Sequence, residues 1–137
     1  RVGADVSQRD RECIADHLDG SIVHARVWCH RDYRSRNWIV SPGSLEFNVI
    51  DFGQSRPDLW LIDWVHARLE TRDEPRLWAA FVEGYGRQLD ERNERLFLGL
   101  IGLTGLASLV WSRRHGHQGR REEGHRYLSY FRDRVGS

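Results

Sequence analysis

The sequence contains no lysine and no methionine, and these two absences narrow what its 137 residues can do. All 21 residues in the lysine-plus-arginine count are arginine. A mechanism that takes a lysine from these residues is therefore excluded, whether that lysine forms a Schiff base, belongs to a P-loop or holds a nucleotide phosphate. Because translated reading frames start with methionine, we expect a processed or trimmed chain, or a fragment.

Cysteine is scarce too, since Cys13 and Cys29 are too few for a disulfide framework and too isolated for a zinc site. No signal-like segment opens the sequence, so we expect a reducing, cytoplasmic location. The 21 positive and 20 negative side chains leave a net charge of +1. Nucleic-acid binding usually needs a clear basic excess, so we expect no nucleic-acid partner.

One long apolar run, residues 96–111, raises the question of a membrane segment. It is shorter than the roughly 20 apolar residues that a spanning helix needs. Glycine recurs in it at every third position, which would let one helix face approach a neighbouring backbone closely. We therefore expect a buried helix of a soluble bundle and no membrane segment.

The remaining patterns predict a single unit over residues 1–137 of class α+β, mainly α. Two β-rich runs flank the turn Ser41-Pro42-Gly43-Ser44, which is typical of a hairpin. Ser7 can cap a first helix that Gly20 ends, while Pro57 and Pro75 can each open a helix. The elements expected are helices over about 7–19, from 57, from 75 to 84, over 96–111 and over 118–134, an extended run over 25–29, and hairpin strands over 38–40 and 45–50.

Polar residues whose side chains could act in catalysis or bind a metal flank the hairpin on both sides. His30-Arg31-Asp32-Tyr33-Arg34-Ser35-Arg36-Asn37 precedes it, and Asp51-Phe52-Gly53 follows it. Because a hairpin returns the chain on itself, Asn37 and Asp51 should lie close together. Their amide and carboxylate oxygens are ligands that Mg²⁺ prefers, and Asp32 can accept a proton from a substrate hydroxyl.

The order H-R-D-x-x-x-x-N, hairpin, D-F-G resembles the catalytic core of the protein-kinase-like fold. The A-P-E segment of protein kinases is missing. Instead Asp51-Phe52-Gly53 leads quickly into Ile62-Asp63-Trp64 and then Phe81-Val82-Glu83-Gly84-Tyr85-Gly86. This arrangement resembles the aminoglycoside phosphotransferase family, which also includes choline-kinase-like and other small-molecule kinases.

The resemblance implies roles for individual residues. Asp32 would be the catalytic base, and Asn37 and Asp51 would bind Mg²⁺ and, through it, the nucleotide. His30 would support the catalytic loop, residues 30–37. Asp63, on the first helix after Asp51-Phe52-Gly53, would hold this loop in place without taking part in the chemistry.

Two arginines depart from the antibiotic kinases of this family. Those enzymes usually carry glycine where Arg31 stands. Arg34 is more similar to the basic residue of the protein-kinase loop that contacts the transferred phosphate, a role that a bidentate guanidinium can fill.

The prediction is thus the C-terminal lobe of a small-molecule kinase that transfers the γ-phosphoryl group of ATP or GTP to a hydroxyl of a small polar acceptor, such as an aminoglycoside-type antibiotic. The N-terminal nucleotide lobe, with its phosphate-holding lysine, would lie outside these residues, which alone should be inactive. A non-catalytic kinase-like remnant or binding module is the alternative, followed by a protein kinase.

Plainer interpretations exist for several residues. Asp32, Asn37 and Asp51 could simply satisfy backbone groups in a turn-rich loop. Cys29 is better explained as a small buried hydrophobe than as a nucleophile. A polar linker between helices explains three histidines near the end of the sequence better than a metal site does; they are His115, His117 and His125.

Overall fold

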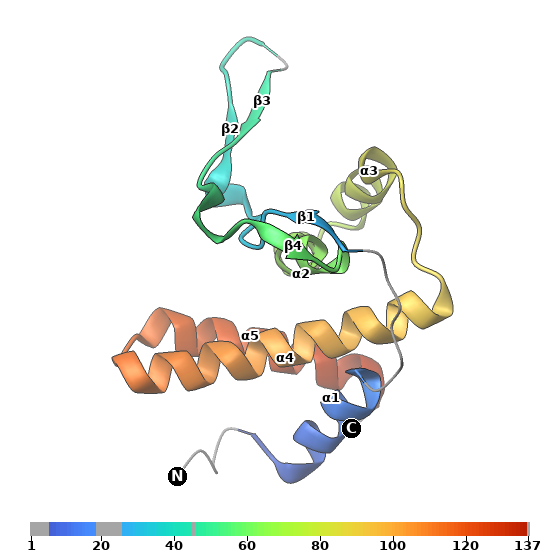
Figure 1. Ribbon diagram of the computed structural model, residues 1–137, viewed down its shortest axis with the longest axis vertical. Helices are drawn as coiled ribbons and strands as arrows, with labels where there is room; N and C mark the ends of the chain where they lie inside the picture. The colour runs from blue at the N-terminus through green and yellow to red at the C-terminus, as the bar shows by residue number, and fades with distance from the viewer. Residues whose placement is uncertain (1–5, 19–25, 45, 137) are drawn as a thin grey trace. The chain divides into compact units, whose positions relative to one another are not determined.

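The computed structural model describes residues 6–18, 26–44 and 46–136 of the chain. It is mostly helical with two small antiparallel sheets, which confirms the α+β, mainly α class (Figure 1). Asp19, Gly20, Ala25 and Leu45, which the predicted elements include, lie outside the described residues. The elements are α1 (Gln8–Leu18), β1 (Val27–Cys29), the 3₁₀ turn η1 (Ser35–Asn37), β2 (Trp38–Val40), β3 (Phe47–Val49), the 3₁₀ turn η2 (Phe52–Gln54), β4 (Arg56–Asp58), α2 (Leu61–Glu70), α3 (Pro75–Tyr85), α4 (Glu91–His115) and α5 (Gln118–Val135).

The chain divides into two compact units, where the sequence led us to expect one. Residues 1–22 and 89–137 form the helical unit, which contains α1, α4 and α5. Residues 23–88 form the loop unit, which contains both sheets, α2 and α3. Every residue predicted to carry chemistry lies in the loop unit.

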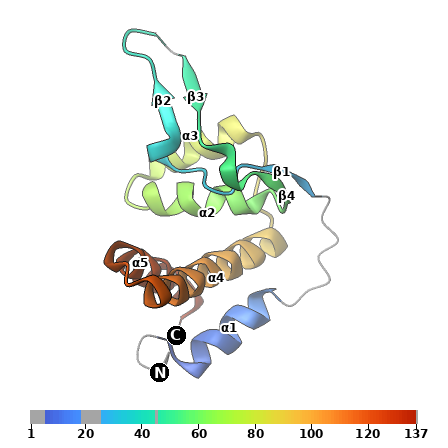
Figure 2. The same ribbon diagram turned by 60° about the vertical axis from the view of Figure 1, so that its left-hand side comes forward.

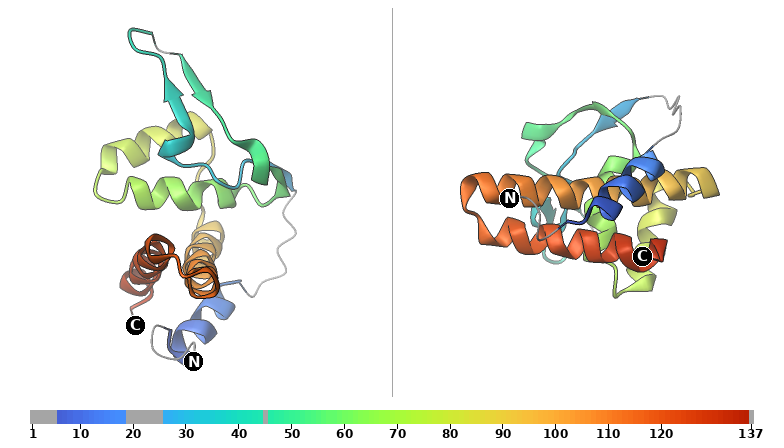
Figure 3. Two further views of the ribbon diagram at one scale, coloured as in Figure 1. Left: turned by 90° about the vertical axis from the view of Figure 1, so that its left-hand side faces the viewer. Right: turned by 90° about the horizontal axis from the view of Figure 1, so that it is seen from below.

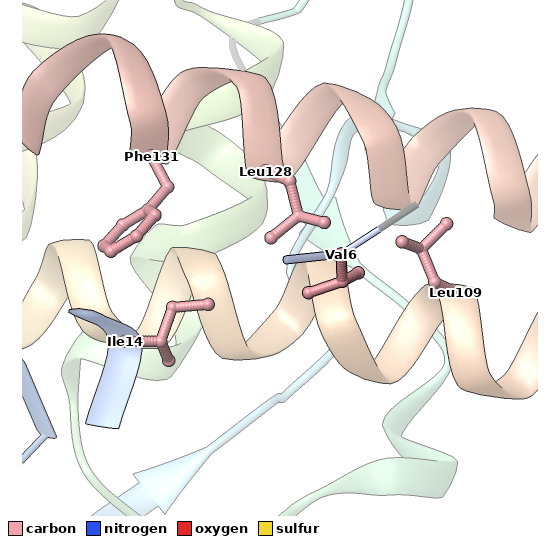
Figure 4. Packing of buried hydrophobic residues seen from close by; sticks show 5 residues of the cluster. All are labelled: Val6, Ile14, Leu109, Leu128 and Phe131. Atoms are coloured by element: carbon pink, nitrogen blue, oxygen red, sulfur yellow. The ribbon is translucent and has the colours of Figure 1, made fainter. Parts of the chain in front are cut away.

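The helical unit is a hairpin of two long helices with α1 packed against it (Figure 3). One apolar cluster of its core takes side chains from α1, α4 and α5 and from Val6, two residues before α1 (Figure 4). The members of this cluster are Val6, Ile14, Leu109, Leu128 and Phe131.

Glycines let these helices approach closely, as their spacing predicts. A Cβ on Gly102 would lie 2.6 Å from Cγ1 of Ile14, and one on Gly105 would lie 3.0 Å from the backbone oxygen of Gly124. Both distances are too short for an ordinary side chain. Glycine at these positions therefore sets the spacing of α4 from α1 and α5.

A paired carboxylate also ties α1 to α5. Arg132 donates from Nε and from a terminal nitrogen to the two oxygens of Asp10, each at 2.8 Å. Ser7, the predicted N-cap, accepts a hydrogen bond from the Asp10 N–H at 3.0 Å. The hydrogen bond from Arg132 holds the pKa of Asp10 well below its usual range, so the carboxylate stays charged in the fold.

Helix α4 extends beyond the predicted apolar run at both ends. Asp90 caps its start by accepting the Asn93 N–H at 2.7 Å, and Gly116 ends it in the left-handed region with φ 65°. Length and composition alone would let α4 cross a membrane, a test that the core helix of a soluble protein also passes. Here α4 packs against α1 and α5.

In the loop unit the predicted hairpin is confirmed. Strands β2 and β3 pair antiparallel, with Trp38 opposite Val49 and Val40 opposite Phe47 (Figure 2). Gly43 in the connecting turn has φ 80°, a conformation that glycine adopts without strain.

The helix predicted to begin at Pro57 is wrong. Pro57 lies in β4, opposite Trp28 of β1, and α2 begins at Leu61. Proline lacks an N–H but is tolerated on an edge strand, and both strands of a two-stranded sheet are edges. The helix predicted from Pro75 is confirmed and ends at Gly86, whose φ is 73°.

Aromatic rings join α2 to α3. Trp64, which is fully buried, makes edge-on contacts with Trp60 and with the rings of α3. Its ring centroids lie 5.3 Å from Trp78, 5.4 Å from Phe81 and 5.2 Å from Tyr85. This packing gives the loop unit an aromatic core between α2 and α3.

Candidate active site

The hairpin brings its two flanking motifs together. The Ile50 N–H donates to the Asn37 carbonyl at 3.0 Å, directly next to the Trp38–Val49 pair. Asn37 ends η1, directly before β2, and Asp51 follows Ile50 after β3, so the predicted metal ligands lie at neighbouring positions at the base of the hairpin, as the hairpin geometry predicts.

Asp63, in the first turn of α2, holds the start of the catalytic loop. Its Oδ2 accepts the His30 N–H at 3.0 Å, and its Oδ1 accepts the Arg31 N–H at 2.6 Å. Burial raises the pKa of this carboxyl group, and the hydrogen bond from the His30 backbone opposes that rise. The structure thus places Asp63 beside the start of the loop, where both of its carboxylate oxygens accept hydrogen bonds from backbone N–H groups.

His30 links the catalytic loop to the strand before Asp51. Its Nε2 lies 2.8 Å from the Ile50 carbonyl oxygen, and its Nδ1 lies 3.3 Å from the Asp32 N–H nitrogen. Because the carbonyl can only accept and the amide can only donate, Nε2 carries the proton and Nδ1 is the acceptor. The Phe52 ring packs 4.7 Å from the imidazole, so His30 joins both motifs.

Two residues beside the site have left-handed backbone, with φ 68° at Arg31 and φ 63° at Asp51. This region is unfavourable for residues other than glycine, and the cost is of the order of 1–3 kcal/mol each. A left-handed backbone at Arg31 gives a physical reason for the glycine that the antibiotic kinases carry there. Here the Arg31 Nε pairs instead with Asp58 Oδ2 at 3.1 Å.

Asp32 lies between positive groups. Arg34 Nε lies 2.7 Å from its Oδ1, and a terminal nitrogen of Arg36 donates to its Oδ2 at 2.7 Å. Asn37 Nδ2 also donates to Oδ2, at 3.1 Å. Burial raises the pKa of Asp32, but the Arg36 hydrogen bond and the charges of both arginines outweigh it, so the net shift is downward. The group is a carboxylate, the form that a base requires.

Arg34 lies on the buried side of Asp32. The residue is 8% exposed, and a terminal nitrogen lies 2.9 Å from Nδ1 and 3.0 Å from Nε2 of His66. Because arginine only donates, the hydrogen bond goes to the one imidazole nitrogen that carries no proton. The structure therefore brings Arg34 to Asp32 and anchors it on α2.

The donor set at the hairpin base fits Mg²⁺. Asn37 gives its Nδ2 to the Asp32 carbonyl at 2.9 Å as well as to the carboxylate, which leaves its amide oxygen as the ligand atom. Asp51 is exposed and adds a carboxylate. Magnesium is commonly held by one or two protein oxygens together with phosphates and water. Within the described residues, no group of three or more His, Cys, Asp or Glu side chains is arranged so that it could hold a metal ion.

Sequence reasoning did not find two supports of the loop. Glu70 accepts the Ser35 N–H at 2.8 Å, and His66 meets Arg34 as described above. Both share a face of α2 with Asp63, because residues at i, i+3 and i+7 line one side of a helix. That spacing in the helix after the second motif was the available signal.

Cys29, next to His30, is buried with its Sγ 3.3 Å from the Leu59 carbonyl oxygen. Burial, together with the charges of Asp63 and Asp58, raises the pKa of this thiol to about 11. A thiol that remains protonated at neutral pH is a poor nucleophile. This environment agrees with the prediction that Cys29 acts as a small hydrophobe.

Comparison with known proteins gives one match, to a family model. A model of the phosphotransferase enzyme family, APH, matches residues 2–98, which include the catalytic loop, the hairpin and α2. Searches of curated proteins and of solved structures found no match. The family match covers more than half of the chain and agrees with the geometry around Asp32, and the chain therefore belongs to the phosphotransferase enzyme family.

Proposed function

We propose that this chain is the C-terminal catalytic lobe of a small-molecule kinase of the protein-kinase-like fold. It would transfer the γ-phosphoryl group of ATP or GTP to a hydroxyl of a small polar acceptor. The observation that carries the proposal is the hydrogen bonding at the hairpin base, where Asn37 donates to Asp32 and the residue before Asp51 donates to the Asn37 carbonyl. Asp63 and His30 hold the loop through further hydrogen bonds. An aminoglycoside-type antibiotic is the first acceptor to test, because of the family.

In the proposed reaction Asp32 orients the acceptor hydroxyl and takes its proton. The hydroxyl oxygen then forms a bond to the γ-phosphorus, and the bond from that phosphorus to the bridging oxygen breaks, leaving its electron pair on the nucleoside diphosphate. Asp32 later releases the proton to water. The hydrogen bond from Asn37 fixes the plane of the Asp32 carboxylate for this task.

Asn37 and Asp51 are the residues that would hold magnesium. The ion, when bound, would neutralise negative charge on the nucleotide phosphates. Asp51 is kept in place by its neighbour Ile50, whose carbonyl oxygen bonds His30 and whose N–H bonds Asn37. The hydrogen bonds of Ile50 thus fix the backbone beside both proposed ligands.

The proposal is tested by replacing Asp32 with asparagine in the complete gene product. Asp32→Asn keeps the shape of the side chain and removes the base, so turnover should fall by roughly 10²–10⁴-fold, the usual contribution of general base catalysis. ATP affinity, measured by titration calorimetry with magnesium present, should stay near the wild-type value.

The control is Asp73→Asn, which removes a carboxylate that is 83% exposed outside the catalytic loop. It should leave turnover unchanged. Near-wild-type turnover of Asp32→Asn with the acceptors that the unmodified protein phosphorylates would contradict the assignment. An unmodified protein that phosphorylates no acceptor in a broad panel would favour a non-catalytic remnant, and peptide phosphorylation would favour a protein kinase.

A further inference from the structure

The catalytic loop carries three arginines with different surroundings. Arg31 pairs with Asp58 on β4. Arg34 and Arg36 both pair with Asp32, but the side chain of Arg34 is 10% exposed and that of Arg36 is 57% exposed. The two arginines beside the base therefore differ most in their access to solvent.

We propose that Arg36, and not Arg34, is the catalytic-loop arginine that contacts the transferred phosphoryl group, while Arg34 positions Asp32. This inference rests on the proposed phosphotransferase activity of the loop. The resemblance in the sequence had instead indicated Arg34 for the contact with the phosphate.

The contacts of Arg34 suit a positioning residue. Its Nε lies 2.7 Å from Asp32 Oδ1, and its terminal nitrogen lies within 3.0 Å of both ring nitrogens of His66. Turning this guanidinium toward a phosphate would break a buried ion pair and leave the Asp32 and His66 acceptors without it, which is costly in a buried setting. Arg34 is thus anchored between α2 and the base.

The contacts of Arg36 suit a mobile cation. A terminal nitrogen lies 2.7 Å from Asp32 Oδ2, and more than half of the side chain is open to solvent. An arginine side chain is long and flexible, so its guanidinium can leave Asp32 without disturbing the core. A planar guanidinium also matches the oxygens of a phosphoryl group.

The hydrogen bonds that the Asp32 carboxylate already accepts give a second reason to assign the phosphoryl contact to Arg36. Its Oδ2 already accepts from Arg36 and Asn37, and Arg34 Nε is paired with Oδ1. Each carboxylate oxygen has about two lone-pair positions, so both positions of Oδ2 are filled and an incoming hydroxyl competes with these donors for that oxygen. Transfer of Arg36 from Oδ2 to the phosphoryl group frees a position for the hydroxyl and brings a positive charge to the reacting group in one movement.

The test compares Arg36→Ala and Arg36→Lys with Arg34→Lys and with Arg72→Ala in the complete gene product. Arg72 is an exposed arginine that pairs with its neighbour Asp73 on the α2–α3 turn. Two quantities are measured: kcat, and the affinity for magnesium–ADP with and without aluminium fluoride, which mimics the phosphoryl group in transfer.

Arg36→Ala should lower kcat about a hundredfold, as removal of one donor to a transition-state charge commonly does. It should lose a similar factor in affinity for the aluminium fluoride complex and none for magnesium–ADP. Arg36→Lys should recover part of both losses. Arg34→Lys should lower kcat while the gain in affinity on adding aluminium fluoride stays, and Arg72→Ala should match the unmodified protein.

Wild-type affinity of Arg36→Ala for the aluminium fluoride complex would overturn the inference alone, as would a selective loss of that affinity in Arg34→Lys. An unmodified protein that neither transfers a phosphoryl group nor binds the complex more tightly than magnesium–ADP would overturn the proposed function, and the inference with it.

Discussion

Asp51 occupies a left-handed backbone position with its carboxylate exposed at the base of the hairpin. The conformation is unfavourable for most side chains, whereas asparagine and aspartate tolerate it better than others. Hydrogen bonds on the preceding residue, Ile50, hold the chain there from both sides. The backbone therefore sets where the proposed metal ligand stands, and its charge can be tested separately from its position.

Asp51→Asn in the complete gene product makes that test, because asparagine keeps the left-handed backbone and removes the charge. Magnesium–ATP should bind about 10–100-fold more weakly, and half-maximal activity should need more magnesium. ATP binding without magnesium should not weaken. Calorimetric titration with and without magnesium chloride measures both effects, with Glu46→Gln on the same hairpin as the control. The same magnesium dependence in Asp51→Asn and the unmodified protein would contradict the assignment.

The sequence predicts which residue types gather at the site better than it predicts their surroundings. Asp32, Asn37 and Asp51 follow from a motif order and a hairpin. The burial of Arg34 depends on His66, which lies 32 positions away on α2. The left-handed backbone of Arg31 depends in the same way on Asp63, also 32 positions away. No local pattern contains these distant contacts.

At the scale of elements, the spacing of α4 and α5 depends on a crossing of two glycines. A Cβ on Gly105 would lie 3.0 Å from the Gly124 carbonyl oxygen, and a Cβ on Gly124 would lie 2.9 Å from the Gly105 carbonyl oxygen. Backbone atoms cannot move aside as the end of a flexible side chain can. The helices must therefore separate if either glycine gains a side chain.

Gly105→Ala should lower the free energy of unfolding by about 1–3 kcal/mol, the usual cost of overpacking. Gly84→Ala is the matched control, since Gly84 is also helical and a Cβ there meets nothing within 4 Å. It should gain about 0.5–1 kcal/mol from the better helix propensity of alanine. Urea unfolding followed by circular dichroism measures both, and a Gly105→Ala variant that is as stable as Gly84→Ala, or more stable, would contradict the close-packing explanation.

Elements with strong local signals were predictable. The Pro-Gly turn identifies the β2–β3 hairpin, and Pro75 with Gly86 marks the start and end of α3. Strand β4 was not, because Pro57 suits both a helix start and an edge strand. Only the pairing with β1, far away in sequence, decides between these two structures.

At the scale of the whole molecule, the proposed base and metal ligands lie in one compact unit, residues 23–88, within the stretch that matches the phosphotransferase family. A kinase site also needs cations for the α- and β-phosphates of the nucleotide. Lysine is the usual residue for that task in protein kinases, and the 137 residues contain none. The site is therefore rich in groups for the acceptor side and the metal, and poor in groups for the rest of the nucleotide.

We therefore expect these 137 residues alone to transfer no phosphoryl group, although they contain Asp32, Asn37 and Asp51. Release of ADP and labelling of the acceptor by γ-labelled ATP measure this, with the complete gene product as the positive control. Its Asp32→Asn variant sets the background of the assay. The physical reason is charge: without further cations on the α- and β-phosphates, neither binding nor departure of the nucleoside diphosphate is stabilised. Turnover by the 137 residues equal to that of the complete product would mean that their arginines hold those phosphates, and the proposal of a separate nucleotide lobe would be wrong.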